Sequence, residues 1–286
     1  NNDSLVGEKY DEYCSFLREN IILPVIRHLG FKATYDKATP KDAEAQKKAK
    51  EEADEKLRLA EEKVAAVIDT RDYETQSFLF FATQKGLVKK TKFTEFHRIQ
   101  SNGKIAITLR EGDELIRVFP TSGEDDICLI SDKGRLARFS ERSVRASGRT
   151  AIGVKGMRLE ATDKVVGVSI PSPGKRLLIS TTGGYGKRTN FDNFSTKNRG
   201  IKGQLAIKPF SNDQKDKGSV IASRAVGDED EVFIIASNGV IIRMHVNSIS
   251  IQGPYGTGVK LMSVEEDVQV TAIAPVIQED LSSNEE

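Results

Sequence analysis

The chain has 286 residues, of which 38% are hydrophobic and 30% charged, so it can bury one large or two modest cores. No run of about 18 apolar residues occurs, and we therefore expect a soluble globular protein that does not enter a membrane. The two cysteines, Cys14 and Cys128, lack CxxC or metal-type spacing, which favours buried structural thiols in a reducing cytoplasm.

The formal net charge of +1 hides an asymmetry. Residues 62–276 contain 32 Lys and Arg against 25 Asp and Glu, a net charge of +7, whereas the rest of the chain is acidic. A basic surplus is compatible with a polyanion partner, but many domains carry as much without binding DNA. Residues 277–286, which include four acidic residues, are predicted to form an acidic disordered tail.

Residues 1–61 are predicted to form a helical segment of unknown role. Apolar residues recur at spacings of three and four from residue 10 to residue 25, which is typical of an amphipathic helix ending near Gly30. A second helix is predicted to begin near Thr39, with Pro40 at its first helical position. Its apolar stripe is narrow and its other face is charged, so we expect this segment to be separable from the rest.

Four segments align without a gap: FLFFATQKGLVKKTKFTEF (78–96), DICLISDKGRLARFSERSV (126–144), RLLISTTGGYGKRTNFDNF (176–194) and EVFIIASNGVIIRMHVNSI (231–249). Each contains an apolar strand, a polar turn ending in glycine, and a second strand with a basic residue four positions after that glycine. The turn glycines are Gly86, Gly134, Gly184 and Gly239. A tight hairpin needs a residue that tolerates positive φ, which explains these glycines by conformation alone.

The hairpins are separated by Gly-containing segments: GKIAITL (103–109), GVKGMRL (153–159), GQLAIKP (203–209) and GVKLMSV (258–264). Each is followed by a β-branched strand, and a fifth strand of this kind, 64–69, precedes the first hairpin. About four strands per repeat is typical of a propeller-like array, and the extra strand suggests that neighbouring blades interlock. We predict a mainly β fold over 62–276, a four-bladed portion of a propeller preceded by the helical segment.

On these residues the chain resembles the C-terminal DNA-binding domain of bacterial DNA gyrase A. The strings FLFFATQKGLVKKTKFTEF, SVRASGRTAIGVKGMRL and GGYGKRT are similar to that domain's later blades, in the family's order. The resemblance implies a β-pinwheel, a propeller variant with strands exchanged between blades, whose basic rim wraps DNA. The corresponding C-terminal domain of topoisomerase IV shares this blade plan and is an alternative, although GYGKRT and SVRASGR look more like gyrase.

The resemblance also implies what surrounds the domain. Its partners would be double-stranded DNA, the remainder of gyrase A, and gyrase B in a heterotetramer. That enzyme is a type IIA topoisomerase that hydrolyses ATP to introduce negative supercoils. The domain would be non-catalytic, with no cofactor or metal of its own, because ATP, Mg and the cleavage tyrosine belong to other parts. The location would be the bacterial cytoplasm, associated with the nucleoid.

The chain departs from the family's pattern in two places. The gyrase A box, a QRRGGKG-like heptapeptide of the first blade, is missing, as are recognisable copies of the first two blades. Because the box is the feature most closely tied to full wrapping, we expect DNA to be bound and bent without a full wrap.

The candidate DNA contacts are cations that recur once or twice per blade, a pattern that favours sequence-independent, salt-sensitive binding of phosphates. On the hairpins they are Lys89, Lys90, Arg138, Lys187, Arg188 and Arg243. On the connections they are Arg98, Lys104, Arg145, Arg149, Lys155, Lys197, Arg199 and Lys202. We expect these side chains to be exposed, so that replacing Arg138, Arg188 and Arg243 together weakens DNA binding and barely changes stability.

Other functions have weaker support. His28, His97 and His245 are isolated, which favours surface or packing roles. The segment 183–189 lacks P-loop spacing and lies in a predicted hairpin, and Tyr185 is not a convincing cleavage tyrosine. The competing hypothesis is a protein-interaction propeller with weak or no DNA binding. Cations on one continuous rim would favour DNA, and scattered cations would favour the interaction scaffold.

Overall fold

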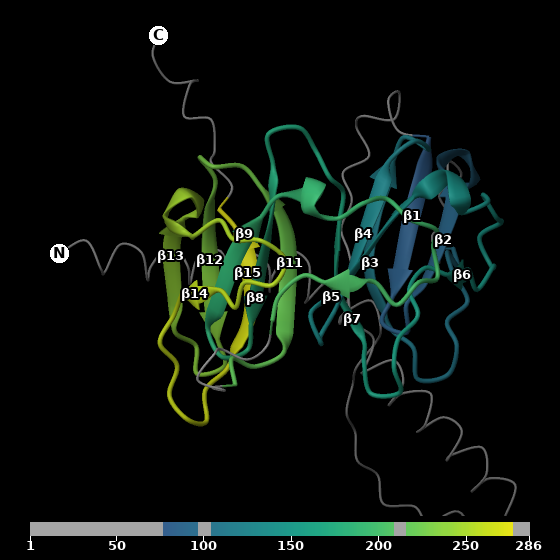
Figure 1. Cartoon of the computed structure of the whole chain (residues 1–286). Helices are drawn as coiled ribbons and strands as arrows, with labels where there is room; N and C mark the ends of the chain where they lie inside the picture. The colour runs from purple at the N-terminus through teal and green to yellow at the C-terminus, as the bar shows by residue number, and fades with distance from the viewer. Residues whose placement is uncertain (1–76, 97–103, 209–215, 277–286) are drawn as a thin grey trace, which may run out of the picture. The chain divides into compact units, whose positions relative to one another are not determined.

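The computed structural model describes residues 77–96, 104–208 and 216–276. The predicted N-terminal helices, the strand 64–69 and the acidic tail lie outside the described residues. In the described ranges the chain forms antiparallel strands, which are grouped into four sheets, and short 3-10 helices (Figure 1). The predictions of a mainly β fold and four sequential blades are therefore confirmed for this part of the chain.

The four sheets follow one another along the sequence. The first has the order β3 (Leu115–Thr121), β1 (Phe78–Thr83), β2 (Leu87–Lys92) and β6 (Val154–Lys155). The second has the order β10 (Gln204–Leu205), β5 (Arg135–Ser140), β4 (Asp126–Ser131) and β7 (Val165–Ser169). The third has the order β11 (Val220–Val226), β8 (Arg176–Thr181), β9 (Tyr185–Thr189) and β14 (Val259–Lys260). The fourth has the order β13 (Ile241–His245), β12 (Glu231–Ala236) and β15 (Val270–Pro275).

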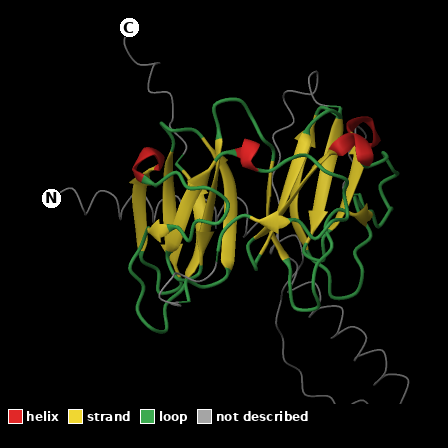
Figure 2. Cartoon of the chain, viewed as in Figure 1, coloured by secondary structure: helices red, strands yellow, loops and turns green. Residues whose placement is uncertain are grey.

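A short 3-10 helix follows the second strand of each hairpin, at the end of its sheet (Figure 2). These helices are η2 (Phe93–Phe96), η3 (Glu141–Ser143), η4 (Phe191–Asn193) and η5 (Val246–Ser248). A helix this short leaves main-chain carbonyls without partners inside it. Those carbonyls are available to side chains of a neighbouring blade.

Strand exchange links the blades. Each of the first three sheets is completed by a two-residue strand from the following repeat: β6 pairs with β2, β10 with β5, and β14 with β9. The prediction that neighbouring blades interlock is confirmed for these three pairs. Among the described residues, the fourth sheet has three strands, and β13 forms its edge.

The hairpin glycines have two roles. All four have positive φ, between 75° and 85°, as the turn pattern predicts. In the first three hairpins the glycine also lies against the next repeat. A Cβ added to Gly134, for example, would lie 2.7 Å from the carbonyl oxygen of Ile207, which is closer than Cβ atoms pack. Gly239, in the fourth hairpin, has nothing within 4 Å of that position.

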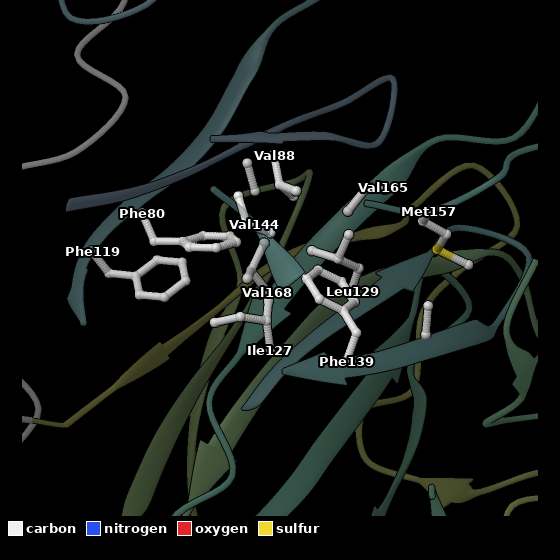
Figure 3. Packing of buried hydrophobic residues seen from close by; sticks show 12 residues of the cluster. Phe80, Val88, Phe119, Ile127, Leu129, Phe139, Val144, Met157, Val165 and Val168 are labelled. Carbon is white, nitrogen blue, oxygen red and sulfur yellow. The ribbon is translucent and has the colours of Figure 1, made fainter. Parts of the chain in front are cut away.

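The core consists of layers between successive sheets. Alternate residues of a strand face opposite sides. On β4, Ile127 and Leu129 pack with the first blade, and Cys128 and Ile130 pack with the third. Figure 3 shows the layer between the first two blades, where Phe80 and Phe119 lie with ring centroids 5.5 Å apart. This double-sided burial explains why the first strands of the hairpins are almost continuously apolar.

Candidate nucleic-acid interface

The structure places most of the hairpin cations inside the protein. Lys89 and Lys187 are 0% exposed, Arg188 is 5% exposed and Lys90 is 6% exposed. Arg138 is half-buried, and its side chain is 17% exposed. The expectation that hairpin cations are exposed is therefore wrong for these five residues. The second strand of each of these hairpins is covered by the following repeat, which buries its side chains on both faces.

The recurring basic residue four positions after the turn glycine binds main-chain carbonyls of the next blade. Lys90 Nζ donates to the carbonyl of Glu141 at 3.1 Å, and Arg138 donates to the carbonyls of Phe191 and Phe194 at 3.0 and 3.2 Å. Arg188 repeats this pattern with the carbonyls of Asn247 and Ile249, at 3.0 and 2.7 Å. Each acceptor belongs to the 3-10 helix of the next repeat or to the residue just after it. The repeated cation is therefore an interblade contact.

Arg243 occupies the same position in the fourth hairpin but has a different environment. Its side chain is 56% exposed and pairs with Glu231 of its own sheet, with Nε donating at 3.0 Å. Arg138 has the equivalent bond within its own blade, from Nε to Asp126 at 2.9 Å. Arg243 thus has the hydrogen bond to a carboxylate of its own blade, but among the described residues its side chain forms no hydrogen bond to another blade. It is the hairpin candidate that remains at the surface.

The two fully buried lysines also bind main-chain carbonyls: Lys187 binds two in the next repeat, and Lys89 binds one in its own repeat and one in the next. Lys187 Nζ donates to the carbonyl of Gly253 at 2.5 Å and to that of Pro254 at 3.0 Å. Lys89 Nζ donates to the carbonyls of Ala106 and Arg149. Burial lowers the pKa of Lys187 to about 8, and burial together with the charge of Arg149 lowers the pKa of Lys89 to about 8. These ammonium groups are committed to the interior and cannot reach a phosphate.

The connection cations divide into exposed and partly covered residues. Arg145, Lys155 and Lys197 are exposed. Lys104, Arg149, Arg199 and Lys202 are half-buried, and Arg98 lies outside the described residues. Arg199 donates to the carbonyls of Ser143 and Lys155, each at 3.0 Å, and Lys202 pairs with Glu160 at 2.5 Å. The exposed residues are those best placed for a ligand outside the protein.

The list of candidates from the sequence omits two exposed cations that lie on or next to the exchanged strands. Lys260 lies on the exchanged strand β14, and Arg158 follows β6. The signal for Lys260 was present, because GVKGMRL and GVKLMSV align Lys155 with Lys260. Both lysines lie on the outermost strand of a sheet. No described carboxylate forms an ion pair with either of them.

The residues rejected as catalytic candidates on sequence grounds make ordinary packing or surface contacts where the structure describes them. The segment 183–189 lies in the third hairpin, as predicted, and the Lys217 ammonium lies 4.4 Å from the ring centroid of Tyr185. His245 is exposed, with Nδ1 3.3 Å from Glu231. Cys128 is buried, and burial raises the pKa of its thiol to about 12, whereas His28, His97 and Cys14 lie outside the described residues. No helix in the described part of the chain is long and apolar enough to cross a membrane.

Comparison with solved structures gives the same fold. The structure of a DNA gyrase A C-terminal domain superposes with a TM-score of 0.64 at 26% identity, covering 73% of this chain and 69% of that one. The crystal structure of a C-terminal domain of DNA topoisomerase IV superposes with a TM-score of 0.69 at 23% identity, covering 76% of this chain and 67% of that one. At that identity the second likeness concerns the fold alone.

Sequence comparison finds relatives that are DNA gyrase A proteins. DNA gyrase A of Salmonella typhimurium is 42% identical over 219 residues, and that of Mycolicibacterium smegmatis is 40% identical over 222 residues. Each match covers 77% of this chain but only 24% and 26% of the relative, so the chain spans about a quarter of these relatives' length. The family described as "DNA gyrase C-terminal domain, beta-propeller" matches residues 77–122, 125–172, 175–226 and 230–277. With one match to each of its four blades, the chain belongs to the DNA gyrase C-terminal domain family.

Proposed function

We propose that this domain binds duplex DNA without sequence preference along the outer edges of its blades and bends it. The observation that carries the proposal is the repeated placement of exposed lysines on exchanged strands. Lys155 on β6 and Lys260 on β14 occupy equivalent positions in the first and third sheets. Arg145 and Lys197 are exposed on the connections of the second and third repeats. These four residues are called the outer-edge cations below.

The chemistry of this arrangement suits phosphates. Exposed ammonium and guanidinium groups that lack carboxylate partners can neutralise DNA phosphates and release their counterions, which gives salt-sensitive binding without base recognition. Bending a site of 20–30 base pairs by 40–90° costs about 1–6 kcal/mol, so several contacts must accompany the bend. Cations that recur from blade to blade supply contacts of this kind.

The family supports a place for the domain within a larger enzyme. Its relatives are gyrase A proteins about four times the length of the matched region, so the domain would be a non-catalytic part of a type IIA topoisomerase. Its partners would then be the remainder of gyrase A and gyrase B, and the complex would act in the bacterial cytoplasm. ATP and Mg would be used by those other parts.

The proposed extent of wrapping rests on a departure of the sequence from the family's pattern. Because the gyrase A box is missing from the chain, we propose that the domain bends DNA without completing a wrap. Topology assays with the full chain and relaxed circular DNA would then show little handed writhe, although binding occurs. A strong handed effect would contradict this part of the proposal.

The test is a set of affinity measurements with the full chain and linear duplexes of unrelated sequence at several salt concentrations. Replacing the four outer-edge cations by Gln should lower affinity equally for all sequences. The slope of log affinity against log salt should become shallower by about 0.9 for each phosphate that is no longer neutralised. The control variant, Lys133→Gln with Arg142→Gln, removes exposed cations that already pair with Glu160 and Glu124.

The result also separates the DNA-binding hypothesis from the interaction-scaffold hypothesis. If the folded quadruple variant keeps the salt slope of the unmodified chain, the outer-edge cations do not contact DNA. If the unmodified chain shows no salt-dependent affinity at all, the interaction scaffold becomes the better explanation of the fold.

A further inference from the structure

A small cavity lies between strands of the first three blades that are at the opposite end of each sheet from the exchanged strand; these strands, β3, β7 and β11, are called the inner strands below. It has a volume of about 200 Å³ and is lined by residues of β3, β7 and β11 and of the loop after β7. Its polar lining consists of Arg117, Ser169, Ser172, Lys175 and Arg224. Pockets for drug-sized ligands begin at roughly 300 Å³, so this cavity suits a smaller occupant.

The charged side chains that line the cavity are all positive. Arg117 and Arg224 are both half-buried and lie close enough to repel each other. Burial and then the charge of Arg224 lower the pKa of Arg117, and burial lowers the pKa of Arg224. The lining contains no carboxylate, although like charges brought together away from water destabilise the fold unless something neutralises them.

The arginines differ in how they are held. Arg117 Nη1 donates to the carbonyl of Val168 at 2.6 Å, and its guanidinium lies 5.5 Å from the ring centroid of Phe119. These contacts hold Arg117 beside the cavity. The side chain of Arg224 forms no hydrogen bond or ion pair with any residue in the described ranges, so its guanidinium donors are available.

A second polar group of the cavity lining, the hydroxyl of Ser169, also lacks a partner. Ser169 is only 4% exposed, and its Oγ has no hydrogen-bond partner among the described residues. A buried hydroxyl without a partner is unfavourable, and most such groups in folded proteins are satisfied by protein, water or a ligand. The same cavity therefore contains an unpaired buried donor and an unpaired guanidinium.

We propose that this cavity binds a small multivalent oxyanion of the phosphate class, with Arg117 and Arg224 as its charge partners and Ser169 as a hydroxyl donor. Guanidinium groups match the oxygen geometry of phosphate and can bind it through two parallel hydrogen bonds. Such an anion neutralises the arginine pair and supplies an acceptor for Ser169. Lys175, which is exposed, adds positive charge at the edge of the cavity.

The phosphate group could come from solution or from a DNA strand. The small volume and the partly apolar wall, which includes Phe119 and Ala225, favour a free ion. This site is also distinct from the outer-edge cations, because it lies on the inner strands, at the end of each sheet opposite to the exchanged strand. Occupation by the free ion should therefore leave DNA affinity unchanged.

The experiment measures the melting temperature of the full chain with inorganic phosphate, with pyrophosphate, and with sodium chloride at matched ionic strength. At about ten times its dissociation constant, a specific ion should raise Tm by about 3–6 °C, and chloride should not. Arg224→Gln should abolish the shift and, without phosphate, should leave Tm equal or higher because the repulsion with Arg117 is removed. Arg142→Gln, on the exposed surface, should keep the shift.

Ser169→Ala separates a binding role from a packing role. It should weaken phosphate binding about tenfold while leaving the empty protein as stable as before, because the hydroxyl has no partner to lose. Equal phosphate shifts in the unmodified protein and in Arg224→Gln would overturn the proposal, as would the absence of any shift. If Arg224→Gln instead lowers affinity for duplex DNA, the occupant is a DNA phosphate, and the proposal of a free ion is wrong.

Discussion

The third and fourth blades contain the same sequence pattern but use it differently. In the third blade, β14 of the next repeat covers the edge, Gly184 lies against Met262, and Arg188 is buried among carbonyls of the fourth repeat. In the fourth blade, among the described residues, β13 is an edge strand. No atom lies close to the position of an added Cβ at Gly239, and the side chain of Arg243 is exposed. The role of a repeated residue is therefore decided by whether a following repeat covers it.

The largest expected difference between the two blades is at the repeated arginine. Arg188→Ala removes contacts to Asn247, Ile249 and Asp228 from a nearly buried site, so we expect the free energy of unfolding to fall by about 3 kcal/mol or more. Arg243→Ala removes a contact with Glu231 on an exposed side chain, and we expect little change. Urea unfolding of the two variants measures both values, and equal losses would contradict the interblade role.

The turn glycines give the next largest difference. Gly134→Ala introduces both a left-handed alanine and a clash with Ile207, so we expect a loss of about 2–4 kcal/mol. Gly239→Ala introduces the same backbone strain in open space and should cost about 1 kcal/mol. Thermal unfolding of both variants measures the difference. Similar losses would mean that backbone conformation alone explains these glycines.

The buried lysines make stability depend on pH. Burial lowers the pKa of Lys187 from its ordinary value of 10.5 to about 8 in the folded protein, so the unfolded chain binds more protons between these values. Stability therefore rises with pH across this window. In Lys187→Met the rise should be smaller by about 1–3 kcal/mol, while Lys89 retains its own part. Denaturation curves at about pH 7.5 and pH 10 test this, and parallel pH dependence of both proteins would count against it.

The smallest expected effect is on amide exchange. The Arg188 amide donates to the carbonyl of Ser250 at 2.9 Å, outside its own hairpin. The equivalent amide of Arg243 has no such acceptor among the described residues. We expect the Arg243 amide to exchange with deuterium at least about tenfold faster. Comparable protection of both amides would indicate that β13 is covered.

Much of the fold could be predicted from the sequence. The gap-free alignment of four hairpins indicated the blades, and the turn glycines indicated the hairpin positions, because both follow from local patterns of apolar residues and of positive φ. The extra leading strand predicted at 64–69 suggested that the blades interlock, and the strands exchanged in the structure are β6, β10 and β14. The hairpins and their turn glycines repeat at every blade, and they depend little on what lies across the interface.

The candidate site was predicted less well, for a physical reason. Lys187 and Arg188 look like surface cations in a hairpin strand, and only the arrival of residues 247–254 from the next repeat buries them. A sequence pattern with period two shows which face a side chain occupies but not what covers that face. Lys260 could have been found from its alignment with Lys155. The proximity of Arg117 and Arg224 could not, because they come from different blades and non-equivalent positions.

One measurement tests directly whether the outer-edge cations, rather than the hairpin cations, contact DNA. Lysines of the intact chain are acetylated with and without duplex DNA, and the modified positions are quantified by mass spectrometry. We expect Lys155, Lys197 and Lys260 to react in the free protein and to be protected by DNA, whereas Lys89 and Lys187 react little in either state. Unchanged labelling of Lys155 and Lys260 on DNA binding, or ready labelling of Lys187 in the free protein, would contradict this assignment.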